Sequence, residues 1–278
     1  MSILEVCNLR KEYRSFLLDD VSFSLEEGKI TGFIGRNGAG KSTTLKSLFG
    51  FVRPDGGSVE FFGKPFKSNE DEIKRRTGFL LGEVNYYAGK KISAITRVTK
   101  PFFSTWDDAA YEKYTKMFSL DENKKPSELS AGMKVKYSLA LALSHGAELL
   151  ILDEPTSGLD PFSRDELLEI FGDLCREGKT LLFSTHITSD LMRCADNIIY
   201  IKKGRIIYDG DMNAYTDGYR VVEFDEANEL PHEKLIGARR EKSGYSALIR
   251  AEDVDEKTQC RAATLEEIML HIEREDKT

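Results

Sequence analysis

Eight residues near the N-terminus, GRNGAGKS at positions 35–42, have the composition and spacing of a loop that binds phosphate. Glycines let the backbone pass close to an anion, and the free N–H groups at a helix start point toward it. The ammonium of Lys41 would reach the β- and γ-phosphates of a nucleotide, and the hydroxyl of Ser42 would bind magnesium. A glycine-rich turn without a ligand is the alternative. We predict a nucleotide site formed by Gly35, Arg36, Asn37, Gly38, Ala39, Gly40, Lys41, Ser42 and Thr43.

Two adjacent carboxylates follow the apolar run in ELLILDEP, residues 148–155. Asp153 would hold magnesium through water at the carboxyl end of a strand, where α/β sheets bind ligands. Glu154 is placed to orient an attacking water or to take its proton. A salt bridge without catalytic function is the alternative for both carboxylates. His186 ends another apolar run, LLFSTH, and its ring either hydrogen-bonds a γ-phosphate or has a structural role.

A second candidate anion-binding helix start lies in LSAGM, residues 129–133, immediately before the helical stretch KVKYSLALALSHG. Ser130 and Gly132 would offer a hydroxyl and backbone N–H groups, and we expect the helix to begin near Met133. The chain therefore contains two helix starts suited to phosphate, which one nucleotide in one chain does not require.

Short apolar runs alternate with longer helical patterns, which predicts an α/β domain with a largely parallel central sheet. The early strands look antiparallel, and RIIYDG after residue 204 is expected to complete a hairpin. Between about 86 and 146 the strand signal gives way to helical spacing, so we expect a helical insertion. Residues 219–278 are interpreted as a small β-plus-helix domain appended to a domain of residues 1–218; its helix would begin at Thr264, with Glu267 completing a capping box. The expected strands are 3–6, 21–25, 30–34, 58–62, 78–81, 149–152, 180–184 and 198–201.

The overall composition excludes several classes of function. With 40 basic and 47 acidic residues, the net charge of -7 gives no global attraction to nucleic acid, and we expect no nucleic-acid partner. The four cysteines and four histidines are scattered without the spacing of a zinc site or a redox pair. No apolar run approaches the roughly 18 residues of a membrane span, so a cytoplasmic location is expected.

With these motifs, residues 1 to about 215 resemble the nucleotide-binding subunit of an ABC transporter. GRNGAGKST is similar to the family's Walker A motif, LSAGM to its signature, LLILDEP to its Walker B motif and His186 to its switch histidine. SGLD at 157–160 is similar to its D-loop. The resemblance implies a P-loop NTPase core of ABC type with a mixed sheet, an antiparallel β subdomain and a helical insertion.

The resemblance also implies a function, with its cofactors and partners. The cofactors would be ATP and Mg²⁺, Tyr13 would stack on adenine, and the reaction would be hydrolysis of ATP to ADP and phosphate. Two subunits, identical or related, would meet head to tail, so that Ser130 and Gly132 of one approach ATP held by the other. Asp160 of the D-loop is also expected among the nucleotide-binding residues. A separate membrane permease would hold the subunit on the cytoplasmic face. Its expected contact is the helical insertion near 83–125, including aromatic residues Tyr86, Tyr87, Phe102, Phe103 and Trp106.

Some features refine this resemblance. The motif GMK, the residues TW at 105–106 and the C-terminal extension are most similar to the ABC-2-type exporter branch. Where the family usually has a magnesium-contacting glutamine, this sequence has Gly82 followed by Glu83; either Glu83 substitutes as a metal ligand or the contact is absent. Ala131 and Met133 replace the more common glycine and glutamine of the signature. Two alternatives stay open: an ABC ATPase that acts as a soluble factor, and a small-molecule P-loop kinase.

Overall fold

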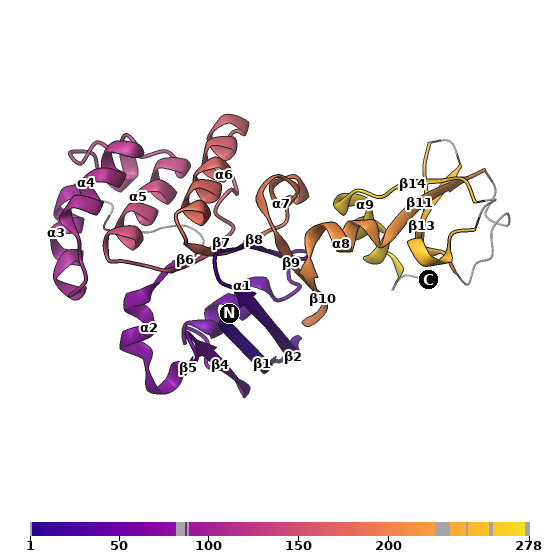
Figure 1. Ribbon diagram of the computed structural model, residues 1–278, viewed down its shortest axis with the longest axis horizontal. Helices are drawn as coiled ribbons and strands as arrows, with labels where there is room; N and C mark the ends of the chain where they lie inside the picture. The colour runs from indigo at the N-terminus through magenta and orange to yellow at the C-terminus, as the bar shows by residue number, and fades with distance from the viewer. Residues whose placement is uncertain are drawn as a thin grey trace.

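A computed structural model describes residues 2–81, 87, 89–225, 234–242, 244–255 and 258–275. Figure 1 shows an elongated arrangement in which the helices α3 to α5 and the C-terminal strands lie at opposite ends of the central strands. Residues 82–86, which include the predicted metal ligand Glu83 and the aromatic Tyr86, lie outside the described residues.

The central sheet has six strands in the order β10-β9-β3-β8-β7-β6. All neighbours are parallel except β10, which pairs antiparallel with β9 and forms the predicted hairpin. Strands β3, β7 and β8 are buried along their whole length because apolar groups cover both faces of the sheet. The strands are β3 (Ile30–Ile34), β6 (Thr77–Leu81), β7 (Leu149–Asp153), β8 (Thr180–Thr185), β9 (Asn197–Lys202) and β10 (Arg205–Asp211).

Two apolar clusters lie on opposite faces of this sheet. Successive side chains of a strand point to opposite faces, so Leu149 and Ile151 join one cluster while Leu150 and Leu152 join the other. The first cluster includes strands β1 and β2 and helix α1, and the second includes helices α5 and α6. The helices are α1 (Lys41–Leu48), α2 (Glu70–Arg76), α6 (Pro161–Arg176), α7 (Thr188–Cys194) and α8 (Met212–Asp217). The predicted α/β fold with a mixed sheet is confirmed.

A second sheet is antiparallel, as the early sequence predicts, with the order β2-β1-β4-β5. Strands β1 and β2 extend well beyond the expected runs, because their antiparallel pairing continues as far as Tyr13 and Phe16 at the turn. The prediction that the strand at 58–62 includes Phe62 is wrong, since Phe62 and Gly63 both have positive φ (54° and 70°) and form the turn to β5. The strands are β1 (Ser2–Tyr13), β2 (Phe16–Glu26), β4 (Gly56–Phe61) and β5 (Lys64–Pro65).

The stretch between β6 and β7 contains α3 (Ile92–Thr99), α4 (Asp108–Met117) and α5 (Ala131–Ser144). A buried tyrosine fastens α5 to α3: the hydroxyl of Tyr137 lies 2.9 Å from Thr96 Oγ1 and donates to the carbonyl of Ile92 at 3.1 Å. Helix α5 begins at Ala131 and not near Met133, because Ser130 accepts a hydrogen bond from the Met133 N–H and so caps the helix two residues earlier than expected.

From Tyr219 the chain forms a third, antiparallel sheet with the order β12-β13-β11-β14. The helix α9 (Leu265–Ile272) follows, with the predicted capping box between Thr264 and Glu267, and it packs on α7, β12 and β13. The strands are β11 (Tyr219–Phe224), β12 (Ile236–Arg240), β13 (Tyr245–Arg250) and β14 (Cys260–Ala262). Within the described part of the chain, every helix is too short or too polar to cross a membrane.

Candidate functional site

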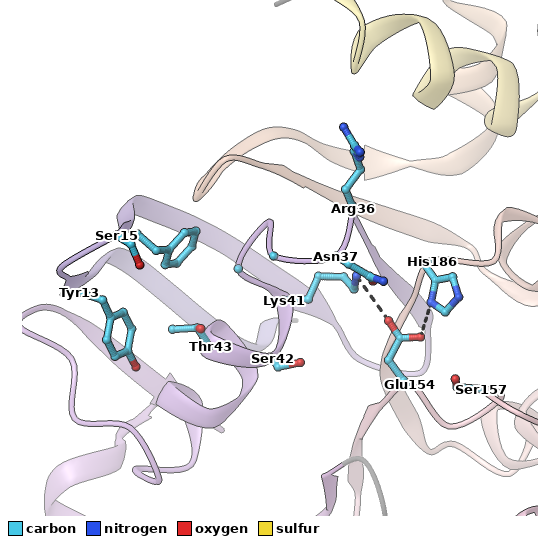
Figure 2. Close-up of a pocket in the computed structure, with 13 residues that line it drawn as sticks. Tyr13, Ser15, Arg36, Asn37, Lys41, Ser42, Thr43, Glu154, Ser157 and His186 are labelled. Carbon is cyan, nitrogen blue, oxygen red and sulfur yellow. Dashed lines mark hydrogen bonds and ion pairs between the residues drawn. The ribbon is translucent and has the colours of Figure 1, made fainter.

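A cavity of about 840 Å³ opens beside the loop between β3 and α1. Figure 2 shows its lining: side chains near the β1–β2 turn lie at one end, and Glu154 and His186, which follow β7 and β8, lie at the other. The loop and the start of α1 lie between them. The lining residues are Tyr13, Ser15, Phe16, Arg36, Asn37, Gly38, Gly40, Lys41, Ser42, Thr43, Glu154, Ser157 and His186.

The loop backbone depends on its glycines, as Gly40 and Gly35 show. Gly40 precedes α1 with φ 119°, a conformation that L side chains rarely adopt. A Cβ at Gly35 would lie 2.4 Å from the carbonyl oxygen of Ile201 on β9, so a side chain there would push the loop from the sheet. No side chain caps the first turn of α1, which leaves its N–H groups directed at the cavity.

Lys41 is only 6% exposed, although it lines the cavity. Its ammonium donates to the carbonyl of Gly35 at 2.7 Å and lies 3.4 Å from Glu154 Oε1. The first contact closes the loop on its own lysine, and the second joins the loop to the end of β7. A buried ammonium with these two partners is a fixed positive charge inside an anion-binding loop.

Glu154 links three elements of the core. One carboxylate oxygen faces Lys41, and the other, Oε2, accepts a hydrogen bond from His186 Nδ1 at 2.8 Å. Figure 2 shows both contacts as dashed lines. His186 follows β8 and is half exposed on the cavity side. Lys41 and His186 therefore hold the orientation of this carboxylate at the wall of the cavity.

Ser184 is a positioning residue that sequence reasoning missed. Its hydroxyl donates to Asp153 Oδ1 at 2.6 Å and accepts from the N–H of Glu154 at 2.9 Å. The contact follows from the parallel register, which pairs Asp153 with Ser184. The sequence signal was a serine at the strand end in LLFSTH, but only the register of β7 and β8 shows which residue it faces.

At the opposite end, Tyr13 is 44% exposed at the β1–β2 turn. The ammonium of Lys11 lies 5.6 Å from the centre of its ring. Ser15 and Phe16 also line this end and were not singled out in the sequence, because turn residues carry no motif. An exposed ring that borders a polar cavity can stack on a planar heterocycle.

The second helix start does not belong to this cavity. Ser130 is exposed, and a Cβ at Gly132 would lie 3.6 Å from the Cβ of Ser163, so Gly132 packs near the start of α6. Asp160 caps α6 by accepting from the N–H groups of Phe162 and Ser163 at 3.0 and 3.1 Å. The Ser163 hydroxyl, with these N–H groups, lowers the pKa of the Asp160 carboxyl. The structure thus separates Ser130, Gly132 and Asp160 from the phosphate loop of the same chain.

The described residues offer hard oxygen donors of the type that Mg²⁺ binds. The hydroxyl of Ser42 lines the cavity. Asp153 is 7% exposed at the end of β7, and one of its carboxylate oxygens is held by Ser184. Among the described contacts, the buried Asp153 carboxylate has no basic partner, which fits a role in binding a cation. The oxygens of Ser42 and Asp153 therefore suit Mg²⁺. Glu83 lies outside the described residues.

Comparison with known proteins agrees with this geometry. The ABC transporter family model matches residues 18–157. The chain is 33% identical over 210 residues to the bacitracin transport ATP-binding protein BcrA of Bacillus licheniformis, covering 74% of this chain and 69% of that protein. It is 36% identical over 213 residues to the Nod factor export ATP-binding protein I of Burkholderia orbicola, covering 74% and 70%. A solved ATP-binding subunit of an ABC transporter matches with a TM-score of 0.69 at 28% identity, covering 76% of this chain and 91% of that one. The resemblance to this family is confirmed, and the chain belongs to the ABC transporter family as one of its ATP-binding subunits.

Proposed function

We propose that this subunit hydrolyses MgATP to drive export through a separate membrane permease. The observation that carries the proposal is Glu154, whose carboxylate is fixed between Lys41 and His186 at the mouth of the central sheet. The relatives are named for bacitracin transport and Nod factor export, which supports an exporter. In this proposal residues 1–218 form the ATPase domain and residues 219–278 an accessory domain.

ATP would lie along the cavity with adenine against Tyr13 and the phosphates in the loop. The lining places Ser42 and Thr43 between these ends, so one extended nucleotide can reach both. Lys41 would meet the β- and γ-phosphates, since its ammonium is already held inside the loop. The uncapped N–H groups of α1 would receive the remaining phosphate oxygens.

The ion would be held by Ser42 and, through water, by Asp153. Bound Mg²⁺ would neutralise charge on the phosphates as the terminal phosphoryl group leaves. Glu154 would orient the attacking water and take its proton. His186 would hold Glu154 through its Nδ1 and direct the rest of its ring toward the γ-phosphate. Ser184 would keep Asp153 and Glu154 in register for these separate roles.

A second subunit would complete the site. Ser130, Gly132 and Asp160 lie outside the cavity of their own chain, and the exposed Ser130 hydroxyl stands at the start of α5. In a head-to-tail dimer this helix start would face the γ-phosphate of ATP in the partner. This arrangement explains why one chain has two helix starts suited to phosphate. The partner would be an identical or related ABC subunit.

The permease would dock beside the helical insertion, on the cytoplasmic face of the membrane. An apolar groove of about 370 Å³ lies between this insertion and the core, and Phe51, Phe79 and Phe103 line it. Phe51 is 62% exposed, and Phe103 stacks on His145 with ring centres 4.1 Å apart. The exposed Phe102 and Tyr87 could extend this contact. The ring of Trp106 packs 5.5 Å from that of Tyr111, so it belongs to the helical packing.

The test of hydrolysis is the substitution Glu154→Gln. The amide keeps the size of the side chain; its oxygen can still accept from Lys41, and its NH2 can donate to Nδ1 of His186 in the other tautomer, so ATP binding should persist. Loss of the general base should lower the release of free phosphate about a hundredfold or more. The matched control is Glu166→Gln, which changes an exposed carboxylate of α6. Near-normal phosphate release by Glu154→Gln would refute the assignment.

A further inference from the structure

The C-terminal helix α9 reaches the phosphate loop. Glu273 follows its last turn, and its Oε2 lies 3.8 Å from the guanidinium of Arg36, the second residue of GRNGAGKS. Figure 2 shows Arg36 directed toward the yellow helix and away from the group formed by Lys41, Glu154 and His186. The family model ends at residue 157, so it includes Arg36 but not α9.

Several contacts fix Glu273 in this position. Its Oε1 accepts a hydrogen bond from the hydroxyl of Tyr200 at 3.0 Å, and Tyr200 on β9 is fully buried. Lys202, on the same strand, donates to the carbonyl of Ile272 at 2.7 Å. The side chain of Glu273 is 14% exposed, whereas that of Arg36 is 62% exposed. The carboxylate is therefore the fixed member of the pair, and the guanidinium is the member free to move.

The location of this carboxylate is not explained by helix stability. A negative charge at the carboxyl end of a helix is unfavourable, because that end already carries partial negative charge. Burial raises the pKa of the Tyr200 hydroxyl, and the charge of the Glu273 carboxylate raises it further. Glu273 thus has two contacts that link α9 to the core, and only the contact with Arg36 leads to the nucleotide cavity.

We propose that Glu273 is a positioning residue through which the C-terminal domain lowers the affinity of the phosphate loop for ATP. Glu273 holds the Arg36 guanidinium toward α9 and offsets its positive charge. When Arg36 is released, its charge adds to that of Lys41 in attracting the triphosphate. This inference rests on the proposed placement of the phosphates in the loop.

Linkage makes the effect reciprocal. If α9 restrains Arg36 against ATP, then ATP must weaken the contact between Arg36 and Glu273 by the same factor. The loosened segment would be the end of α9, where the contacts of Tyr200 and Lys202 and the contact of His271 with the Gly237 carbonyl would remain. Movement of the C-terminal domain, by a permease or by the other subunit, would in turn alter the affinity for nucleotide.

The experiment measures the affinity of the full chain for a non-hydrolysable ATP analogue with Mg²⁺, by calorimetry. Glu273→Gln keeps the shape of the side chain and the bond to Tyr200 but removes the charge. It should tighten binding about two- to fivefold, the range expected for a partly exposed ion pair. Glu266→Gln is the matched control, because it removes an exposed carboxylate from the same helix; it should leave the affinity unchanged.

A double-mutant cycle with Arg36→Gln separates this role from simple bracing. In the Arg36→Gln background, Glu273→Gln should have little further effect on the affinity. An unchanged or weakened affinity for Glu273→Gln alone, or an equal gain in both backgrounds, would overturn the inference. Absence of nucleotide binding by the unmodified chain would instead refute the proposed function.

Hydrogen exchange of the unmodified chain gives a test that requires no stable Glu273 variant. The analogue should increase exchange in the last turn of α9, and Arg36→Gln should abolish this increase. Unchanged or reduced exchange in α9 of the unmodified chain, at saturating analogue, would contradict the coupling.

Discussion

Alanine substitutions at Lys41 and Ser130 should separate nucleotide binding from assembly of the dimer. Lys41 is 6% exposed and makes charge-assisted contacts inside the loop. Hydrogen bonds to a charged group contribute about 1.5–3 kcal/mol, so Lys41→Ala should weaken ATP binding by the monomer about 10- to 150-fold. The variant also leaves Glu154 without its cation, and the repulsion between this carboxylate and the phosphates favours the upper part of that range.

Ser130→Ala should leave monomer binding within about twofold, because Ser130 does not line the cavity. It should lower ATP-driven dimerisation and turnover at least tenfold, since in the proposed dimer the Ser130 hydroxyl would face the partner's phosphate. The same substitution removes the cap of α5, whose contact with the Met133 N–H measures 3.2 Å. The expected loss of stability is about 1 kcal/mol.

A second variant distinguishes assembly from capping. Ser130→Asn restores a good cap but replaces the hydroxyl with a larger amide, so the protein should be as stable as the original and still fail to turn over. Monomer affinity is measured by calorimetry at low protein concentration, and dimerisation by light scattering with ATP in the Glu154→Gln background. Equal loss of monomer binding in Lys41→Ala and Ser130→Ala would refute the head-to-tail arrangement, as would full turnover by Ser130→Asn.

Two other predictions concern the ends of the molecule. The hydrogen bond from Arg261 lowers the pKa of the Glu267 carboxyl from 4.5 to about 2. Its ionised form therefore stabilises the fold at pH values above 4.5, and this contribution of about 1–2 kcal/mol, which allows for solvent exposure, disappears as pH falls toward 2. Glu267→Gln should reduce the free energy of unfolding at pH 7 by that amount and make stability less dependent on pH below 4.5. An unchanged pH dependence in denaturation experiments would contradict this prediction. In the apolar groove beside the helical insertion, Phe51→Asp should reduce capture of the permease from detergent extracts at least tenfold without affecting ATP binding. The control is Phe162→Asp, which changes an exposed aromatic residue on α6. Equal capture by both variants would exclude the groove as the docking site.

Local sequence was sufficient to predict the loop and the strands that end beside it. The chemistry of GRNGAGKS and of ELLILDEP is carried by neighbouring residues, and the flanking apolar runs identify their elements. The contact of Ser184 with Asp153 could not be predicted because it depends on the register of two parallel strands. The contact between Arg36 and Glu273 was still harder to predict, because no sequence pattern relates a residue of the phosphate loop to the end of a helix more than 200 positions later.

The backbone at Glu154 shows why two adjacent carboxylates can have different roles. In a continued strand, Glu154 would point to the face opposite Asp153, but its φ of 52° turns the chain at that residue. This left-handed conformation costs about 1–2 kcal/mol for a residue with a Cβ. The hydrogen bonds that the Glu154 N–H donates to the hydroxyl of Ser184 at 2.9 Å and to the carbonyl of Ser184 at 3.2 Å offset part of this cost. The turn instead directs the Glu154 carboxylate into the cavity, against Lys41 and His186, while Asp153 stays buried at the end of the strand. The local strain therefore gives the proposed base its place beside the phosphate loop.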